Sequence, residues 1–360
     1  MKTLTTIRTN TVLAGLFCLS ILLLAVGCAT TKKPQPHVYF PGPPDEPRIQ
    51  FLTSFSSEDE LGGGSSFADF IVGTKKGEQP VVKPYGIAIA AGKIYICDTD
   101  AAAVEIVDLA KKSLRYFKPD GEARIALPIN IAVDADGTRY VTDAKRNQVL
   151  VYSGADDYLG AIGTKDEMQP RGIALFKDRI YVTDMKSHCV RVYAKADRKL
   201  LFTFPKDQLD ASGRLFSPTN LAIDEHGNVY VSDTGDFAVK VFDGDGTYKQ
   251  TIGKRGDAPG SIALCKGVAV DRAGCIYVVD AKMQVVQLFD SQGRVLMDFG
   301  DPSTAKGGAT ALPAGIAINY DHLKYFKQYV APGFKAEYII ILTNQVGNRK
   351  VSIFAFGKKS

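Results

Sequence analysis

One repeated segment constrains the fold of this 360-residue chain more than any other feature. Its clearest copy is residues 217–242, SPTNLAIDEHGNVYVSDTGDFAVKVF. β-Branched and aromatic residues, which favour strands, fill residues 220–223, 229–232 and 238–242, and Asp- and Gly-containing turns separate these runs. The segment therefore predicts three short antiparallel strands.

Related segments occur along most of the chain. Each begins with Pro, or with Cys265 in one copy, and has Gly or Asn two places later, at Gly86, Asn130, Gly172, Asn220, Gly267 and Gly315. The spacings are 44, 42, 48, 47 and 48 residues. A period in the forties with about four strands is typical of a propeller blade. The sequence thus predicts an all-β, six-bladed β-propeller of four-stranded antiparallel blades over residues 48–360.

The copies resemble the NHL repeat, whose consensus combines Pro-x-Gly-hydrophobic-Ala, Gly-x-hydrophobic-Tyr-Val-x-Asp and a final hydrophobic strand. The segment DMKSHCVRVY, residues 184–193, places His188 at the His position that gives the family its name. The resemblance covers about residues 83–355. It implies the propeller fold but indicates no single function, because one fold hosts many unrelated sites.

The last repeat contains only three strands, at residues 315–319, 338–343 and 350–354. Residues 48–55, RIQFLTSF, alternate like a strand, yet no blade precedes them. We expect residues 49–55 to supply the outer strand of the C-terminal blade, because this pairing removes two exposed edges.

The first 27 residues resemble a signal segment, with Lys2 and Arg8 ahead of an apolar run. The sequence LAVGC ending at Cys28 resembles a bacterial lipobox, which implies acylation of Cys28 and attachment to a membrane. The alternative is a plain secretory signal with an incidental Cys. Ala29 at the second mature position favours the outer membrane of the cell envelope. Residues 28–47 are rich in Pro and predict an extended tether of about 50 Å.

Two long loops interrupt the pattern. Residues 56–80 are rich in Gly and Ser, and residues 319–337 replace a short turn of the last blade. In the second loop, Leu323, Tyr325, Phe326 and Tyr329 are spaced as in a helix, which would cap the blade or present an aromatic patch to a partner. Cys97, Cys189, Cys265 and Cys275 are in no paired framework and predict four buried free thiols, although export would also permit disulfides.

The second strand of each blade ends in a carboxylate or its amide: Asp98, Asp143, Asp184, Asp233, Asp280 and Asn344. A ring of carboxylates suggests a metal, but Asp or Asn before a turn also accepts backbone N–H bonds. Asn in the sixth blade favours turn capping and no metal.

The capped turns and the strands that start at Pro-x-Gly lie at the same end of each blade, because antiparallel strands alternate in direction. Basic residues are frequent in these loops: Lys83, Lys145, Arg146, Arg171, Lys186, His188, Lys266, Lys282, Arg349 and Lys350. We expect a basic face around the central channel that binds a ligand; the alternative is an ordinary solvated surface.

These observations favour a lipid-anchored, monomeric binding or scaffold module without a cofactor, whose partner is another envelope protein or an anionic glycan. The formal charge of +5 is too small to indicate nucleic-acid binding. A metal-dependent hydrolase or lyase with a site in the channel is the alternative. Such a zinc site needs convergent His residues, and we expect His226 and His322 to lie at the opposite end from His188, while His37 lies in the tether.

Overall fold

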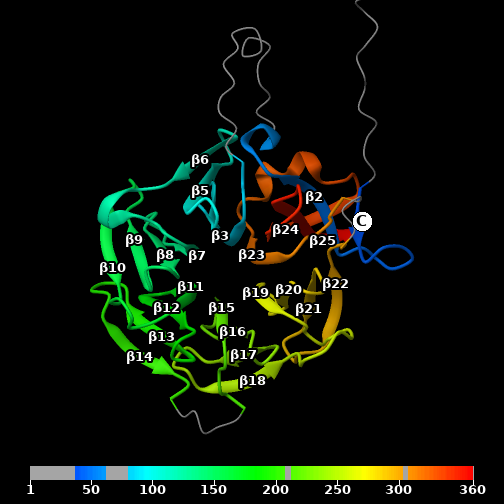
Figure 1. The fold of residues 1–360 in the computed structure, drawn as a ribbon. Helices are drawn as coiled ribbons and strands as arrows, with labels where there is room; N and C mark the ends of the chain where they lie inside the picture. The colour runs from blue at the N-terminus through cyan, green and yellow to red at the C-terminus, as the bar shows by residue number, and fades with distance from the viewer. Residues whose placement is uncertain (1–36, 62–79, 207–211, 303–306, 360) are drawn as a thin grey trace, which may run out of the picture. The chain divides into compact units, whose positions relative to one another are not determined.

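The computed structural model describes residues 37–61, 80–206, 212–302 and 307–359. They form six antiparallel sheets arranged around one axis, which confirms the predicted six-bladed propeller (Figure 1). The predicted signal segment, Cys28 and most of the Gly/Ser-rich loop lie outside the described residues. None of the helices in the described ranges has the length and apolar character needed to cross a membrane.

Five blades follow one another along the chain, each running from the inner strand to the outer one. Blade 1 contains β3 (Pro84–Ala90), β4 (Lys93–Asp98), β5 (Ala103–Asp108) and β6 (Ser113–Phe117). Blade 2 contains β7 (Pro128–Val133), β8 (Arg139–Asp143), β9 (Gln148–Tyr152) and β10 (Tyr158–Ile162). Blade 3 contains β11 (Pro170–Phe176), β12 (Arg179–Asp184), β13 (Cys189–Ala194) and β14 (Leu200–Phe204). Blade 4 contains β15 (Pro218–Ile223), β16 (Val229–Asp233), β17 (Ala238–Phe242) and β18 (Tyr248–Ile252). Blade 5 contains β19 (Cys265–Val270), β20 (Ile276–Asp280), β21 (Val285–Phe289) and β22 (Val295–Phe299).

Blade 6 joins the two ends of the described chain. Its inner strands are β23 (Pro313–Asn319), β24 (Phe334–Asn344) and β25 (Val351–Lys359), and β2 (Ile49–Phe55) is hydrogen-bonded to β25. Gln50 pairs with Ala355 and Ser54 with Ser352, which confirms the predicted closure. Figure 1 shows the blue N-terminal strand beside the red C-terminal one.

A strand that the sequence did not predict extends this sheet. β1 (Tyr39–Phe40) pairs with β2 and lies within the Pro-rich segment, which we had expected to be only a tether. The Phe40 ring lies 6.3 Å from the rings of both Phe299 and Phe354, and so fills the groove between blades 5 and 6. Burial of this aromatic residue is the physical reason that the strand forms where Pro content alone indicated an extended spacer.

The hydrophobic core is divided among the six interfaces between neighbouring blades. One cluster joins β4, β5 and β6 of blade 1 to β7, β8 and β9 of blade 2, and the other five clusters repeat this arrangement around the ring. The second strands β8, β16 and β20 are buried at every position. Both faces of these strands are therefore covered, including the polar residues Arg139 and Thr142 of β8.

The strand register defines two ends of the propeller. Pro84 pairs with Asp98 and Pro170 with Asp184, so the inner strands begin where the second strands finish. We call this the capped end. The opposite end carries residues 319–337, and we call it the insertion end.

The insertion contains two short 3-10 helices, η3 (Leu323–Tyr325) and η4 (Lys327–Tyr329), where the sequence predicted one helix. Phe326 lies between them and is buried in the core shared by blades 6 and 1. The side chain of Gln50 donates to the carbonyl oxygen of Tyr329 at 2.9 Å and accepts from the amide of Ala331 at 3.1 Å. These bonds satisfy the backbone after the second turn, so an α-helical continuation is not needed.

The cysteines differ slightly from expectation. All four described cysteines are free, and Cys97, Cys189 and Cys265 are buried, but Cys275 is only half-buried. Cys275 directly follows the turn at Gly274 and precedes β20, so it lies at the edge of the sheet rather than within it.

Candidate functional site

The residues that end the second strands hold the turns at the capped end. The Asp98 carboxylate is buried and accepts four backbone N–H bonds, from Val82, Lys83, Asp100 and Ala101, at 2.7–3.0 Å. The Asp143 carboxylate makes the same four bonds in blade 2. Backbone donors therefore occupy both oxygens of these carboxylates.

Asn344 holds the same position in blade 6 with an amide. Its Oδ1 accepts from Ala311 at 3.1 Å, and its Nδ2 donates to the carbonyl oxygen of Arg349 at 2.8 Å. Within the described ranges, no group of three or more His, Cys, Asp or Glu side chains is arranged to hold a metal.

The Gly and Asn residues that align the six repeats allow neighbouring inner strands to approach closely. A Cβ atom placed on Gly86 would lie 2.5 Å from the Cα of Asn130, and one on Gly172 would lie 2.7 Å from the Cα of Asn220. Only Gly allows this approach of neighbouring inner strands. Asn130 Nδ2 in turn donates to Asn220 Oδ1 at 2.9 Å, from blade 2 to blade 4. These contacts fix the spacing of the inner strands around the axis.

In each inner strand, the residue between the initial Pro (Cys265 in blade 5) and the aligned Gly or Asn lies one residue nearer the capped end than that Gly or Asn. These residues are Tyr85, Ile129, Arg171, Thr219, Lys266 and Ala314. We call this ring of inner-strand side chains the mouth. The backbones of Tyr85 and Arg171 are held by hydroxyl donors, since Thr343 and Thr142 each donate to their carbonyl oxygens at 2.7 Å.

Two cations and a phenol gather at the mouth. Lys266 Nζ lies 5.4 Å from the centre of the Tyr85 ring and donates to Gln345 Oε1 at 2.5 Å. Burial, and then the nearby charge of Lys83, lower the pKa of Lys266 to about 8. Burial lowers the pKa of Arg171, which nevertheless stays charged, and raises the pKa of Tyr85, which keeps its proton near neutral pH.

No carboxylate offsets the two inner cations. Neither Arg171 nor Lys266 is in an ion pair with a described residue, whereas Lys83 at the edge of the mouth lies 3.6 Å from Asp100. Partly buried cations without a counter-ion are costly, and they create a local demand for an anion.

The other predicted basic residues form a rim outside the mouth. Lys145, Lys186, His188 and Lys282 are exposed, and Arg146, Arg349 and Lys350 are half-buried. Several are committed to the protein: Arg146 Nη1 donates to the carbonyl oxygen of Glu122 at 2.6 Å, Lys186 donates to that of Asp166, and Lys350 to that of Gln345. The structure thus brings Lys83, Arg171 and Lys266 together at the mouth and leaves the rest on the rim.

The sequence reasoning did not include Tyr85 or Gln345 in the site. The signal for Tyr85 was present, because it occupies the same place between Pro and Gly as Arg171. Gln345 follows the cap Asn344, and only the fold shows that this turn reaches the side chain of Lys266.

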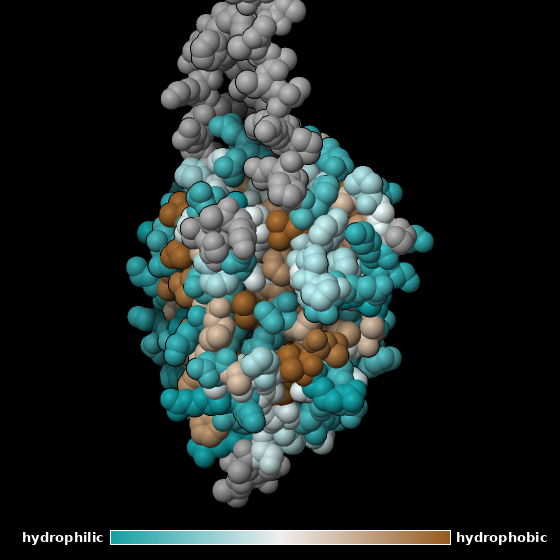
Figure 2. Space-filling model, turned by 90° about the vertical axis from the view of Figure 1, so that its right-hand side faces the viewer, coloured by the Kyte–Doolittle hydropathy of each residue, from teal (hydrophilic) through white to brown (hydrophobic). Residues whose placement is uncertain are grey.

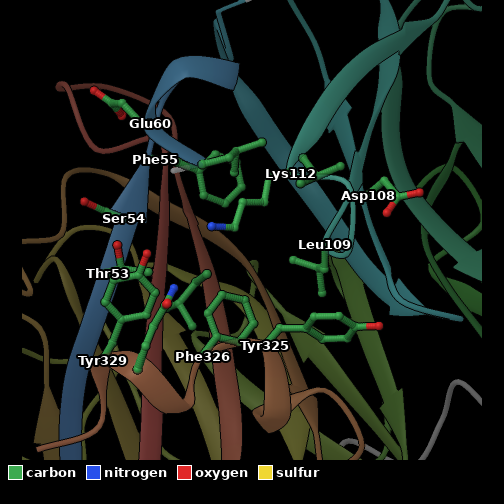
Figure 3. A pocket seen from close by; sticks show the side chains of 14 residues that line it. Thr53, Ser54, Phe55, Glu60, Asp108, Leu109, Lys112, Tyr325, Phe326 and Tyr329 are labelled. Carbon is green, nitrogen blue, oxygen red and sulfur yellow. The ribbon is translucent and has the colours of Figure 1, made fainter. Parts of the chain in front are cut away.

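A cleft lies away from the mouth, on the seam between blades 6 and 1. Figure 3 shows aromatic side chains from β2 and the insertion on one side and the turn after β5 on the other, with the Lys112 ammonium pointing toward the space between Phe55 and Phe326. Its acidic members are engaged: Glu60 accepts from the amide of Ser56, and Asp108 accepts from two backbone amides of its own turn. We therefore place the candidate site at the mouth.

Comparison with known proteins supports the fold. Residues 168–193, which include β11, β12 and all but the last residue of β13, match the family model described as NHL repeat. No curated protein matches the chain.

Among solved structures, the chain resembles a gluconolactonase from Xanthomonas campestris, with a TM-score of 0.56 and 13% identity over 89% of this chain and 97% of that one. It also resembles a streptogramin B lyase, with a TM-score of 0.53 and 13% identity over 85% and 87% of the two chains. A protein of unknown function from Bacteroides thetaiotaomicron has a TM-score of 0.54 and 18% identity over 76% and 70%. At these identities the likeness shows the propeller fold alone.

Proposed function

Since this chain is an NHL-repeat β-propeller, we propose that it is a non-catalytic binding module, anchored by lipid in the cell envelope, that captures an anionic group at its mouth. The group is a carboxylate or phosphate, presented by an envelope protein or by an anionic glycan. The inner strands β11 and β19 position Arg171 and Lys266, and the capped turns hold the loops around them.

The observation that carries the proposal is the pair of inner cations without a counter-ion. An anion between Arg171 and Lys266 would supply the missing charge, and the Tyr85 hydroxyl and the Gln345 amide are neutral donors beside it. Arg offers a planar fork and Lys a compact charge, a combination that suits an anion with several oxygens.

The lipid anchor is proposed from the sequence, where LAVGC at Cys28 follows an apolar run and Ala29 follows the Cys. Acylation would hold the module at a membrane, and Ala29 supports the outer membrane. Intact-mass analysis of the protein purified from a bacterial membrane tests this part: the expected product begins at acylated Cys28, and an uncleaved or unacylated chain would refute it.

Calorimetric titration with oligogalacturonate, a carboxylate glycan, tests the mouth directly. We expect binding by the wild type, no binding of neutral malto-oligosaccharide, and a loss of at least about tenfold in Arg171→Ala/Lys266→Ala, since each charged hydrogen bond is worth about 1.5–3 kcal/mol. The matched control is Lys145→Glu/Lys282→Glu, which changes rim charge and leaves the mouth intact. Binding should also weaken as the pH rises through about 8, where Lys266 loses its proton.

A photoreactive residue in place of Thr219 at the mouth tests, in intact cells, whether an envelope protein presents the anionic group. A cross-link to one envelope protein that disappears in Arg171→Ala/Lys266→Ala would assign the anion to that protein. If neither oligogalacturonate nor an envelope protein depends on the two cations, the proposed binding function is wrong.

A further inference from the structure

The Lys266 side chain lies in an environment that the rim lysines do not share. Figure 2 shows that hydrophilic residues predominate on the side of the propeller at the right of Figure 1, with apolar residues in separate patches. Lys145 and Lys282, in the turns after β8 and β20, are exposed. Lys266 starts instead from the inner strand β19 and is half-buried. Partial burial removes hydration from an ammonium group and favours its neutral form.

No carboxylate pairs with Lys266 among the described residues. Its Nζ donates to Oε1 of Gln345, a buried neutral amide, and lies 5.4 Å from the centre of the Tyr85 ring. Its charged neighbour is a second cation, Lys83, which itself lies 3.6 Å from Asp100. A desolvated lysine beside another cationic group is one of the arrangements that activate an amine as a nucleophile.

Part of the Lys266 amine is therefore neutral near pH 7. Burial, and then the charge of Lys83, lower the pKa of Lys266 to about 8, so about one molecule in ten has the neutral amine at pH 7. For an ordinary lysine, with a pKa of about 10.4, the share is about one in 2,500. The neutral amine has a lone pair on nitrogen, which attacks the carbonyl carbon of an aldehyde or ketone.

Arg171 adds a site for a carboxylate in the same ring of side chains. It extends from the inner strand β11, and both cations act on Tyr85. The Lys266 ammonium lies over the phenol ring, and the Arg171 charge opposes the rise in the pKa of the hydroxyl that burial causes. A guanidinium presents a planar fork that binds a carboxylate through two parallel hydrogen bonds. The mouth thus combines a group that binds carboxylates with one that reacts with carbonyls.

We propose that the mouth captures 2-oxo acids, with the ligand carboxylate on Arg171 and the ligand carbonyl carbon bonded to Lys266 as a reversible imine. The amine nitrogen adds to the carbonyl carbon, and a proton moves from nitrogen to oxygen to give a carbinolamine. The hydroxyl group takes a proton from solvent and leaves as water, and the nitrogen returns a proton to solvent. One amine and one carbonyl thus give one imine and one water, with no oxidant or reductant. The inference rests on the proposed anion binding at the mouth and names the ligand class.

Reductive trapping tests the imine in the purified full-length protein. Glyoxylate is the smallest 2-oxo acid, and sodium cyanoborohydride reduces its imine to a secondary amine that peptide mass spectrometry locates. At pH 7 we expect Lys266 to be modified at least about tenfold faster than Lys145 and Lys282, because a far larger share of its amine is neutral. Equal rates at the three lysines would overturn the proposal.

Arg171→Ala tests the carboxylate site. It should slow the modification of Lys266 by glyoxylate about tenfold, the loss expected when a charged hydrogen-bonding group is removed. Modification by acetaldehyde, which has no carboxylate, should stay unchanged, and this neutral probe also reports whether Lys266 keeps its environment in the variant. An unchanged ratio of the glyoxylate rate to the acetaldehyde rate would refute the pairing of the two side chains.

Lys266→Arg distinguishes this inference from the proposed function, because arginine keeps the positive charge but has no nucleophilic amine. The affinity for oligogalacturonate should stay within about threefold of wild type, while the fast phase of glyoxylate incorporation, followed by intact mass, should disappear. A fast phase that persists in this variant would refute the imine at Lys266. Wild-type protein that binds oligogalacturonate through both cations but modifies Lys266 no faster than Lys145 would refute the imine alone. Rapid, Arg171-dependent modification without oligogalacturonate binding would refute the proposed glycan ligand and leave the imine standing.

Discussion

The buried carboxyl of Glu105 leads to the sharpest prediction about stability. Glu105 lies on β5 opposite Ile96 of β4, and the equivalent residues of blades 3, 4 and 5 are Arg191, Lys240 and Gln287. Each of those three side chains donates to a backbone carbonyl of the loop that enters its blade, on Glu167, Arg214 and Ser261 respectively, at 2.6–3.1 Å. The position is therefore one that ties a loop to its blade.

Glu105 does not make this bond. It is fully buried, no described residue donates a hydrogen bond to either carboxyl oxygen, and its polar neighbour is the Asp98 carboxylate. The carbonyl of Pro80, in the corresponding loop, accepts from the Tyr116 hydroxyl instead. Burial, and then the Asp98 carboxylate, raise the pKa of Glu105 from 4.5 to about 10, so the folded protein holds this side chain protonated at pH 7.

That proton makes stability depend on pH. The folded pKa lies above the unfolded one, so the stabilisation is complete below about pH 4.5 and is lost as the pH rises toward about 10. Each pH unit within this window costs about 1.4 kcal/mol. At pH 7 the unfolding free energy of the wild type is therefore about 3 kcal/mol lower than that of a variant whose side chain at this position has the same shape but does not titrate.

Glu105→Gln supplies such a side chain and copies the residue of blade 5. We expect its unfolding free energy to match that of the wild type near pH 4.5 and to exceed it by about 3 kcal/mol at pH 7, measured by urea denaturation followed by far-UV circular dichroism. Every other titrating group is shared by the two proteins, so the difference between their curves isolates Glu105.

The control is Gln287→Glu, which places the same carboxyl in blade 5 and should reduce stability progressively above about pH 4.5. Parallel curves for Glu105→Gln and the wild type between pH 4.5 and 8 would show that Glu105 titrates normally in the fold. The reasoning from burial would then be refuted.

Two further predictions follow from the capped turns and the insertion. Asp143→Ala leaves four backbone N–H groups without their acceptor and should lower the unfolding free energy by about 3 kcal/mol. Asp100→Ala, at an exposed ion pair, should change it by less than about 1 kcal/mol. Similar midpoints in urea for the two variants would contradict the capping role. His322 Nε2 accepts from the amide of Gly92 at 2.8 Å, and burial lowers the pKa of His322 below 6.5. The unfolding free energy of the wild type should therefore fall as the pH drops through 6.5, by at most about 1.4 kcal/mol per pH unit. The same decline in His322→Leu would exclude His322 as the cause.

The topology could be predicted from the sequence because each blade is formed by residues that are close together in the chain. The turns at Asp224 and Gly227, the alternation within strands and the spacing of Gly86 through Gly315 are all short-range features. Even the long-range pairing of residues 49–55 with the last blade followed from counting, since one strand was missing at one end of the chain and one was extra at the other.

The site could be predicted only in part. Strand direction placed Lys83, Arg171 and Lys266 at one end, but side-chain reach decides which cations meet. Arg146 and Lys186 bond to neighbouring carbonyl oxygens, whereas Arg171 and Lys266 extend from inner strands toward the axis. Partners such as Gln345 come from a different blade, and spacing within one repeat contains no information about them.

The sequence by itself determined the number of blades, the order of their strands and the seam that closes the ring, because these depend on local periodicity and on the count of strands. Only the tertiary structure decided that the Pro-rich segment forms β1, that the insertion folds as two 3-10 turns and that Glu105 is buried beside Asp98 with no donor to its carboxyl. Each of these depends on contacts between residues far apart in the chain, such as Tyr39 with Phe334 or Gln50 with Ala331, and the free energy of such contacts arises only when the blades are assembled.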